Sequence, residues 1–155
     1  MIVKQIVDED VVNYKKTSMV IAFPHCSFKC GDACQNKHLA DSMDVEISID
    51  DIVDRYMKNK FSQAVVMQGL EPLDSIMDVF DFLIKFRKVS NDDVVIYTGY
   101  DKNHFLVNSL IHFVQKEYFD NVILKVGGYN ENDEQVFDKV LGVTLASSNQ
   151  YAFKI

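Results

Sequence analysis

Long hydrophobic runs are missing from this sequence of 155 residues. No apolar stretch approaches the roughly 20 residues that a membrane-spanning helix needs, so we expect no association with a membrane. The first ten residues turn acidic at once and do not resemble a secretory signal peptide. We therefore expect a cytoplasmic protein in a reducing compartment, where disulfide frameworks are rare.

Dense clusters of positive charge are also missing. The chain has 16 Lys and Arg against 23 Asp and Glu, which gives a formal net charge of −7. Binding to nucleic acid needs a basic patch, so we expect no nucleic-acid partner. Internal repeats and linkers rich in Pro, Gly or Ser are absent too. With 48% apolar residues, the length suits a single domain over residues 1–155.

Short apolar runs rich in β-branched residues alternate with longer segments of helical period. The runs predict buried strands over residues 18–23, 64–68, 94–98 and 121–126. The segments between them predict helices over residues 50–60, 74–88 and 102–118. This alternation predicts an α/β fold with a mainly parallel sheet. Functional loops of such folds lie at the carboxyl edge of the sheet.

Cysteine is scarce, and its few copies are gathered in one place. Cys26, Cys30 and Cys34 are the only cysteines, and they directly follow the first predicted strand. Such a cluster in a reducing compartment indicates a metal or iron–sulfur site. A [4Fe–4S] cluster usually takes four thiolates, so three would leave one iron open to a substrate. A structural zinc site that adds His25 or His38 to the three thiols is an alternative.

Four segments resemble, in order, those of a known family. They are Val20-Ile21-Ala22-Phe23-Pro24-His25-Cys26 with the cysteine loop and the following Gln35-Asn36, Gln68-Gly69-Leu70-Glu71-Pro72-Leu73, Val95-Ile96-Tyr97-Thr98-Gly99-Tyr100, and Ser147-Ser148-Asn149-Gln150. On these residues the chain is similar to radical S-adenosylmethionine enzymes. More narrowly, it resembles the small activating proteins of anaerobic (class III) ribonucleotide reductase. The resemblance covers nearly the whole chain and, with its short length, implies a shortened, open (β/α) partial barrel.

The resemblance implies a specific chemistry for the cysteine loop. In it, Cys26, Cys30 and Cys34 hold a [4Fe–4S] cluster whose open iron binds S-adenosylmethionine. An electron, from a flavodoxin-like donor, breaks the sulfonium C–S bond. The resulting 5′-deoxyadenosyl radical takes a hydrogen atom from a glycine on the catalytic subunit of anaerobic ribonucleotide reductase. The expected partners are therefore that subunit and the electron donor.

The resemblance also implies which residues bind S-adenosylmethionine. They lie at the ends of the second and third predicted strands and within the fourth: Gln68, Gly69, Glu71, Thr98, Tyr100 and Lys125. Three of them have structural alternatives. Glu71 would instead favour the start of the next helix, and Tyr100 would cap the core. Lys125 would lay its stem on the sheet while its ammonium reaches water.

The sequence departs from the family pattern at three places. The second gap between cysteines has three residues instead of two, and Ala33 replaces an aromatic residue that packs near adenine in the family. Another ring, such as that of Phe28, would then have to replace it. Leu70 stands where the family has a second glycine. These departures keep two alternatives open: a cluster-binding electron-transfer or interaction module without cleavage activity, and a radical enzyme that acts on another glycyl radical enzyme or a small molecule.

Overall fold

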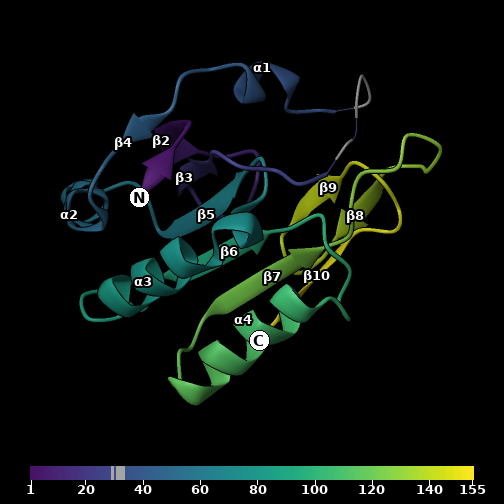
Figure 1. The fold of residues 1–155 in the computed structure, drawn as a ribbon. Coiled ribbons are helices and arrows are strands. Elements are labelled where there is room, and N and C mark those ends of the chain that lie inside the picture. The colour runs from purple at the N-terminus through teal and green to yellow at the C-terminus, as the bar shows by residue number, and fades with distance from the viewer. Residues whose placement is uncertain (29, 31–33) are drawn as a thin grey trace.

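A six-stranded sheet forms the centre of the chain, whose computed structural model describes residues 1–28, 30 and 34–155 (Figure 1). In spatial order its strands are β10 (Tyr151–Lys154), β7 (Val122–Val126), β6 (Asp93–Tyr97), β5 (Ala64–Gly69), β3 (Ser18–Phe23) and β2 (Gln5–Asp10). The four inner strands are parallel, and each outer strand is antiparallel to its neighbour. This confirms an α/β fold with a mainly parallel sheet. The described strands form an open sheet, and the partial barrel stays a prediction.

All four predicted strands are present. The first has both predicted ends, the second and fourth each differ from the prediction by one residue at one end, and the third begins and ends one residue earlier than predicted. Their near-continuous burial explains why an unbroken apolar run marked each of them. The outer strands were not predicted, because β2 is half acidic and β10 has only four residues. The same holds for two short antiparallel pairs, β1 (Ile2–Val3) with β4 (Val45–Glu46) and β8 (Val136–Asp138) with β9 (Val143–Leu145).

Three longer helices occupy the segments predicted for them, and a short α1 (Lys37–Ala40) precedes them. They are α2 (Ile49–Lys58), α3 (Ile76–Phe86) and α4 (Phe105–Lys116). The side chain of Ser48 starts α2, because its oxygen accepts a hydrogen bond from the Asp51 amide at 3.0 Å. His104 caps α4, which therefore begins later than predicted. A separate 3₁₀ turn, η2 (Pro72–Ser75), takes the start of the segment predicted as one helix.

The two faces of the sheet are covered differently. The three helices pack on one face, where alternate strand residues join their apolar stripes in a large core that includes Ile21, Met67, Ile96, Leu124 and Phe82. The opposite face has a smaller core. It consists of the intervening strand residues, such as Val66 and Val95, together with Tyr14, Leu141 and Leu145. The β8–β9 segment and the loop before β3 thus take the place that a second layer of helices would fill.

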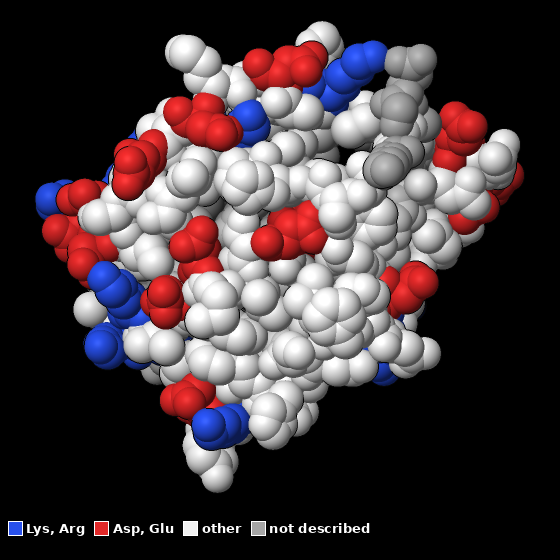
Figure 2. Space-filling model, viewed as in Figure 1, with Lys and Arg blue, Asp and Glu red and all other residues white. Residues whose placement is uncertain are grey.

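Charged side chains are mixed on the surface. Figure 2 shows Lys and Arg dispersed among Asp and Glu on the face drawn, in line with the net charge of −7. Within the part of the chain that the structure describes, no helix combines the length and the apolar character that crossing a membrane requires.

Candidate functional site

A pocket of about 1100 Å³ lies at the carboxyl edge of the parallel strands. Its lining includes residues that directly follow each inner strand: Pro24 after β3, Leu70 after β5, Thr98 after β6 and Gly127 after β7. The sequence predicted a site at this edge because parallel strands present their following loops together there. The pocket therefore lies where the motif segments meet.

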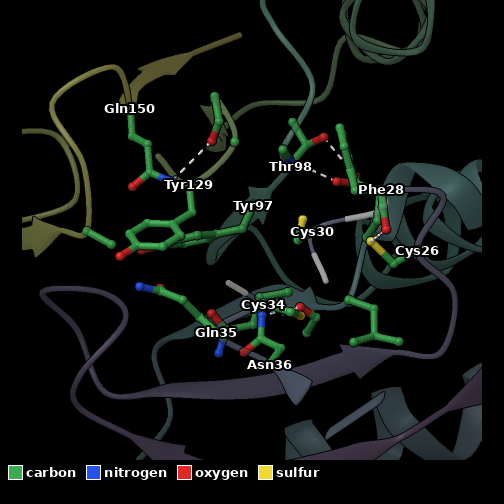
Figure 3. A pocket seen from close by; sticks show the side chains of 18 of the residues that line it. Cys26, Phe28, Cys30, Cys34, Gln35, Asn36, Tyr97, Thr98, Tyr129 and Gln150 are labelled. Carbon is green, nitrogen blue, oxygen red and sulfur yellow. Dashed lines mark hydrogen bonds between the residues drawn. The ribbon is translucent and has the colours of Figure 1, made fainter. Parts of the chain in front are cut away.

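All three cysteines line this pocket. Figure 3 shows Cys26 beside Phe28, with Tyr129 on the far side of the pocket. Burial raises the pKa of the Cys26 thiol, and the negative charge of nearby acidic side chains adds to this increase. Binding to a metal would reverse the effect, because a coordinated thiol is deprotonated.

The three thiols share a pocket without forming a closed ligand set. Among the residues that the structure describes, no three His, Cys, Asp or Glu side chains are gathered closely enough to hold a metal ion. The donor set nevertheless fits an iron–sulfur cluster, whose ligands are thiolates, and metal sites are rarely complete before the metal binds. His25 lines the pocket, whereas His38 is not among its described lining residues. Ala33, the expected departure near adenine, lies outside the described residues.

Glu71 is the buried carboxylate of the site, with 1% of its surface exposed. Its Oε1 accepts hydrogen bonds from the Leu73 amide at 3.0 Å and the Thr98 hydroxyl at 2.7 Å. Its Oε2 accepts one from the Gly99 amide at 2.8 Å. Burial raises the pKa of Glu71, while these three hydrogen bonds oppose the increase. The side chain caps η2, as its structural alternative predicted, and also ties the ends of β5 and β6 together.

The end of β5 requires glycine at one position. Gly69 has a φ of +100°, and a Cβ there would lie 2.8 Å from the Ala22 Cα. Its carbonyl oxygen accepts a hydrogen bond from the Asn36 side chain at 2.8 Å, which ties the end of the cysteine loop to this turn. Among the described non-glycine residues only Tyr118 and Asn121 have positive φ, so Leu70 is unstrained where the family has glycine. Gln68, the residue before this turn, lines the pocket.

Lys125 is a buried cation on β7, facing the pocket with 6% of its surface exposed. Its ammonium donates a hydrogen bond to the Gly127 carbonyl at 2.7 Å and lies 5.8 Å from the centre of the Tyr97 ring. Burial lowers the pKa of Lys125 to about 8, and the charge of Glu71 opposes the decrease. The alternative that its ammonium reaches water is wrong, because the residue is buried and the ammonium donates to a backbone carbonyl instead.

Thr98 and Tyr100 have different places at the end of β6. Thr98 lines the pocket and donates its hydroxyl hydrogen to Glu71. Tyr100 is not among the described lining residues. Its ring centroid lies 4.8 Å from that of Phe28, which does line the pocket. Tyr100 therefore packs against Phe28, which forms part of the pocket wall, and does not itself face the cavity.

Sequence reasoning did not assign roles to Asn149 and Gln150, which hold the loop after β7. The Gln150 side chain donates to the Gly127 carbonyl at 3.2 Å, and that of Asn149 donates to the Gly128 carbonyl at 2.8 Å. Gly127 has a φ of +93°, and a Cβ there would lie 2.9 Å from the Asn149 carbonyl oxygen. The motif Ser147-Ser148-Asn149-Gln150 was the signal, but only the fold shows that it packs against the glycine loop. Asn36 belongs to the first of the four resembling segments, but only the fold shows its hydrogen bond to Gly69.

Comparison with known protein families supports an iron–sulfur cluster in this chain. The family model described as a 4Fe-4S single cluster domain matches residues 15–150, which include all three cysteines and every residue named above as lining the pocket. No curated protein matches the chain at a significant level. Because the match covers most of the chain, the chain belongs to the family of 4Fe-4S single cluster domains and is an iron–sulfur protein.

Proposed function

We propose that the chain is a radical S-adenosylmethionine activase that installs a glycyl radical on anaerobic ribonucleotide reductase. One observation carries the proposal: three thiols, a buried carboxylate and a buried ammonium meet in one pocket at the carboxyl edge of the sheet. Three thiolates on a [4Fe–4S] cluster leave one iron without a protein ligand. The pocket, at about 1100 Å³, has room for a cluster together with a small molecule.

The buried ammonium is the clearest match to a ligand such as S-adenosylmethionine. Among the described residues, no carboxylate forms an ion pair with Lys125. A buried charge without an opposite charge is costly, so a ligand carboxylate that pairs with it recovers a charge-assisted hydrogen bond. In this proposal Lys125 binds the methionyl carboxylate.

Glu71, on the wall of the same pocket, suits the methionyl amine. Glu71 uses three acceptor positions on protein donors, and a carboxylate has about four. Its negative charge and the backbone carbonyls at the end of β5 attract a cationic amine. Amine and carboxylate of one amino-acid moiety would thus meet Glu71 and Lys125, whose charges already influence each other.

The reaction balances with the expected partners. When bound, the cluster supplies one electron, received from a flavodoxin-like donor, to the sulfonium of S-adenosylmethionine. The C–S bond would break to give methionine and a 5′-deoxyadenosyl radical, which would take a hydrogen atom from a glycine Cα of the reductase and leave 5′-deoxyadenosine and a glycyl radical. The protein's own residues bind and orient the reactants and keep water from the radical.

Anaerobic reconstitution with iron and sulfide, followed by an assay for 5′-deoxyadenosine under strong reductant, tests the proposal. We expect a cluster and cleavage of S-adenosylmethionine, both lost in Cys30→Ala. Incubation with the purified catalytic subunit should then produce the electron paramagnetic resonance signal of a glycyl radical.

Other outcomes favour other functions. A stable cluster without cleavage would favour an electron-transfer module, and cleavage without a glycyl radical would point to another target. Tight zinc without iron would contradict the proposal altogether. As a matched control, Lys125→Met should keep the cluster and raise the KM for S-adenosylmethionine, because the Met side chain retains the length of the stem and loses its charge.

A further inference from the structure

One carboxylate connects three separate elements behind the cysteine loop. Ser27, the residue after Cys26, donates both its backbone amide and its hydroxyl hydrogen to Asp74 of η2. The Tyr100 hydroxyl donates to the same carboxylate at 2.6 Å and lies 2.8 Å from the Ser27 hydroxyl. We call Ser27, Asp74 and Tyr100 the Asp74 clamp. It joins residues 47 and 26 positions from Asp74 along the chain.

The clamp is anchored to the helical layer by aromatic rings. The Tyr100 ring stacks on His104, with centroids 4.0 Å apart and planes 8° from parallel. His104 is the N-cap of α4, where its Nδ1 accepts from the Leu106 amide at 3.4 Å. The Tyr100 ring also contacts the ring of Phe28. The Phe28 ring packs close to Gly99, since a Cβ added to Gly99 would lie 3.0 Å from it. These ring contacts fix the position of Tyr100, which in turn fixes the loop through its hydroxyl group.

The clamp acts on the part of the loop that connects two cluster ligands. Ser27 and Phe28 lie between Cys26 and Cys30. Fixing the backbone of a residue costs conformational entropy, so a loop that is already held loses less entropy when a ligand orders it. Two further hydrogen bonds hold the flanks: the Glu71 amide donates to the His25 carbonyl at 2.8 Å, and Asn36 donates to Gly69. The Asp74 clamp instead holds the stretch between the ligands.

We propose that Asp74 is a positioning residue for the iron–sulfur cluster, acting through Ser27 and Tyr100 to hold Cys26 and Cys30 toward the pocket. The inference concerns the site of the proposed function but rests on cluster binding alone. It therefore applies whether or not the chain cleaves S-adenosylmethionine, and the test below contains no S-adenosylmethionine.

The main test compares three variants after anaerobic reconstitution with iron and sulfide. Asp74→Asn keeps the shape of the side chain but presents an amide group to at least one of the hydrogen-bond donors it faces. We expect iron to be lost to a chelator about tenfold faster than from the wild type, the lower end of the usual effect of an outer-shell partner. Tyr100→Phe keeps the ring contacts and removes the two hydrogen bonds of the hydroxyl, but it leaves both hydrogen bonds between Ser27 and Asp74, so its effect should be smaller. Asp81→Asn removes the same charge from an exposed position of α3 and should behave as the wild type.

Two further readouts separate positioning from general stability. The melting temperature of the metal-free Asp74→Asn chain should match that of metal-free Asp81→Asn. After reconstitution, the electron paramagnetic resonance spectrum of the reduced cluster in Asp74→Asn should differ from that of the wild type. The double variant Asp74→Asn/Tyr100→Phe should lose iron no faster than Asp74→Asn alone, because both changes disrupt one network.

Clear results would overturn the inference. One is iron loss from Asp74→Asn at the rate of Asp81→Asn. Another is faster iron loss from Asp74→Asn that is accompanied by a lower melting temperature of the metal-free chain. In that case the effects of Asp74→Asn and Tyr100→Phe on iron loss would also add. If Asp74→Asn does not fold, the same comparison is decided by Tyr100→Phe, since an unchanged rate in that variant contradicts the clamp. Failure to cleave S-adenosylmethionine would count against the proposed function and leave this inference intact.

Discussion

The helix-covered face of the sheet and the pocket at its carboxyl edge are built from the same strands but follow opposite rules. Beneath the helices, Met67, Ile96 and Leu124 are fully buried in an apolar core. At the pocket, Glu71 and Lys125 are also buried, although each carries a charge that water would solvate better. The difference teaches that burial alone does not identify a core. Buried polar groups that cost stability are the ones that indicate a binding site.

The largest expected loss of stability comes from the helix-covered face. Phe82 is fully buried and stacks on Phe86 with ring centroids 5.3 Å apart. We expect Phe82→Ala to lower the free energy of unfolding by about 3–5 kcal/mol, because it removes apolar contacts and leaves a cavity. Urea unfolding of the metal-free chain measures this. Ile84→Ala, at a position 37% exposed on the same helix, should cost much less. Equal losses for the two variants would break the comparison.

Replacing Lys125 in the pocket should have the opposite effect and raise the free energy of unfolding. The pKa of Lys125 falls from 10.5 to about 8 on folding, so between these values the unfolded chain binds more protons and stability rises with pH. At lower pH the full cost of burying the ammonium is present. Lys125→Met should therefore raise the free energy of unfolding by up to about 3 kcal/mol below pH 8, by conversion of the pKa change, and should abolish the rise at higher pH.

Urea unfolding at pH of about 7 and about 10 checks this sign. The exposed Lys88→Met is the control and should change stability little at either pH. A Lys125→Met chain that is less stable than the wild type at the lower pH would mean that the ammonium is already compensated within the protein. That result would contradict the view that the buried Lys125 of the pocket lowers stability while the apolar core raises it.

The smallest effect should come from the end of a helix. Ser48→Ala removes the oxygen that accepts from the Asp51 amide, and we expect a loss of about 1 kcal/mol. Ser109→Ala serves as control, because Ser109 bonds the Phe105 carbonyl within α4 and Ala is the better helix residue there. Thermal unfolding of both metal-free variants measures the difference. Neither should change iron retention, and slower or faster iron loss in Ser48→Ala would extend the functional region into the helical layer.

The sequence by itself determined the inner sheet, the helices that cover it and the importance of the cysteine loop. Periodicity sufficed for the strands because β3, β5, β6 and β7 are apolar along nearly their whole length. It failed for β2 and β10, whose neighbours in space, rather than their own residues, make them strands. Composition and spacing alone predicted a metal or iron–sulfur site, because three cysteines in one short segment are themselves a set of thiolate ligands, and the family resemblance favoured the iron–sulfur cluster over zinc.

Only the tertiary structure decided how the pocket is held together. Asp74 looked like an ordinary acidic residue near a helix start, and its contact with Ser27 spans 47 positions. The burial of the Lys125 ammonium likewise depends on the Gly127 carbonyl and on Gln150, which shares that acceptor from a separate strand end. Hydrogen bonds between distant segments leave no periodic trace in a sequence, because they depend on where the fold brings single side chains. The apolar pattern that drives folding is local and repeated, so the sequence predicts it. The Asp74 clamp depends on single contacts between distant residues, so the sequence does not predict it.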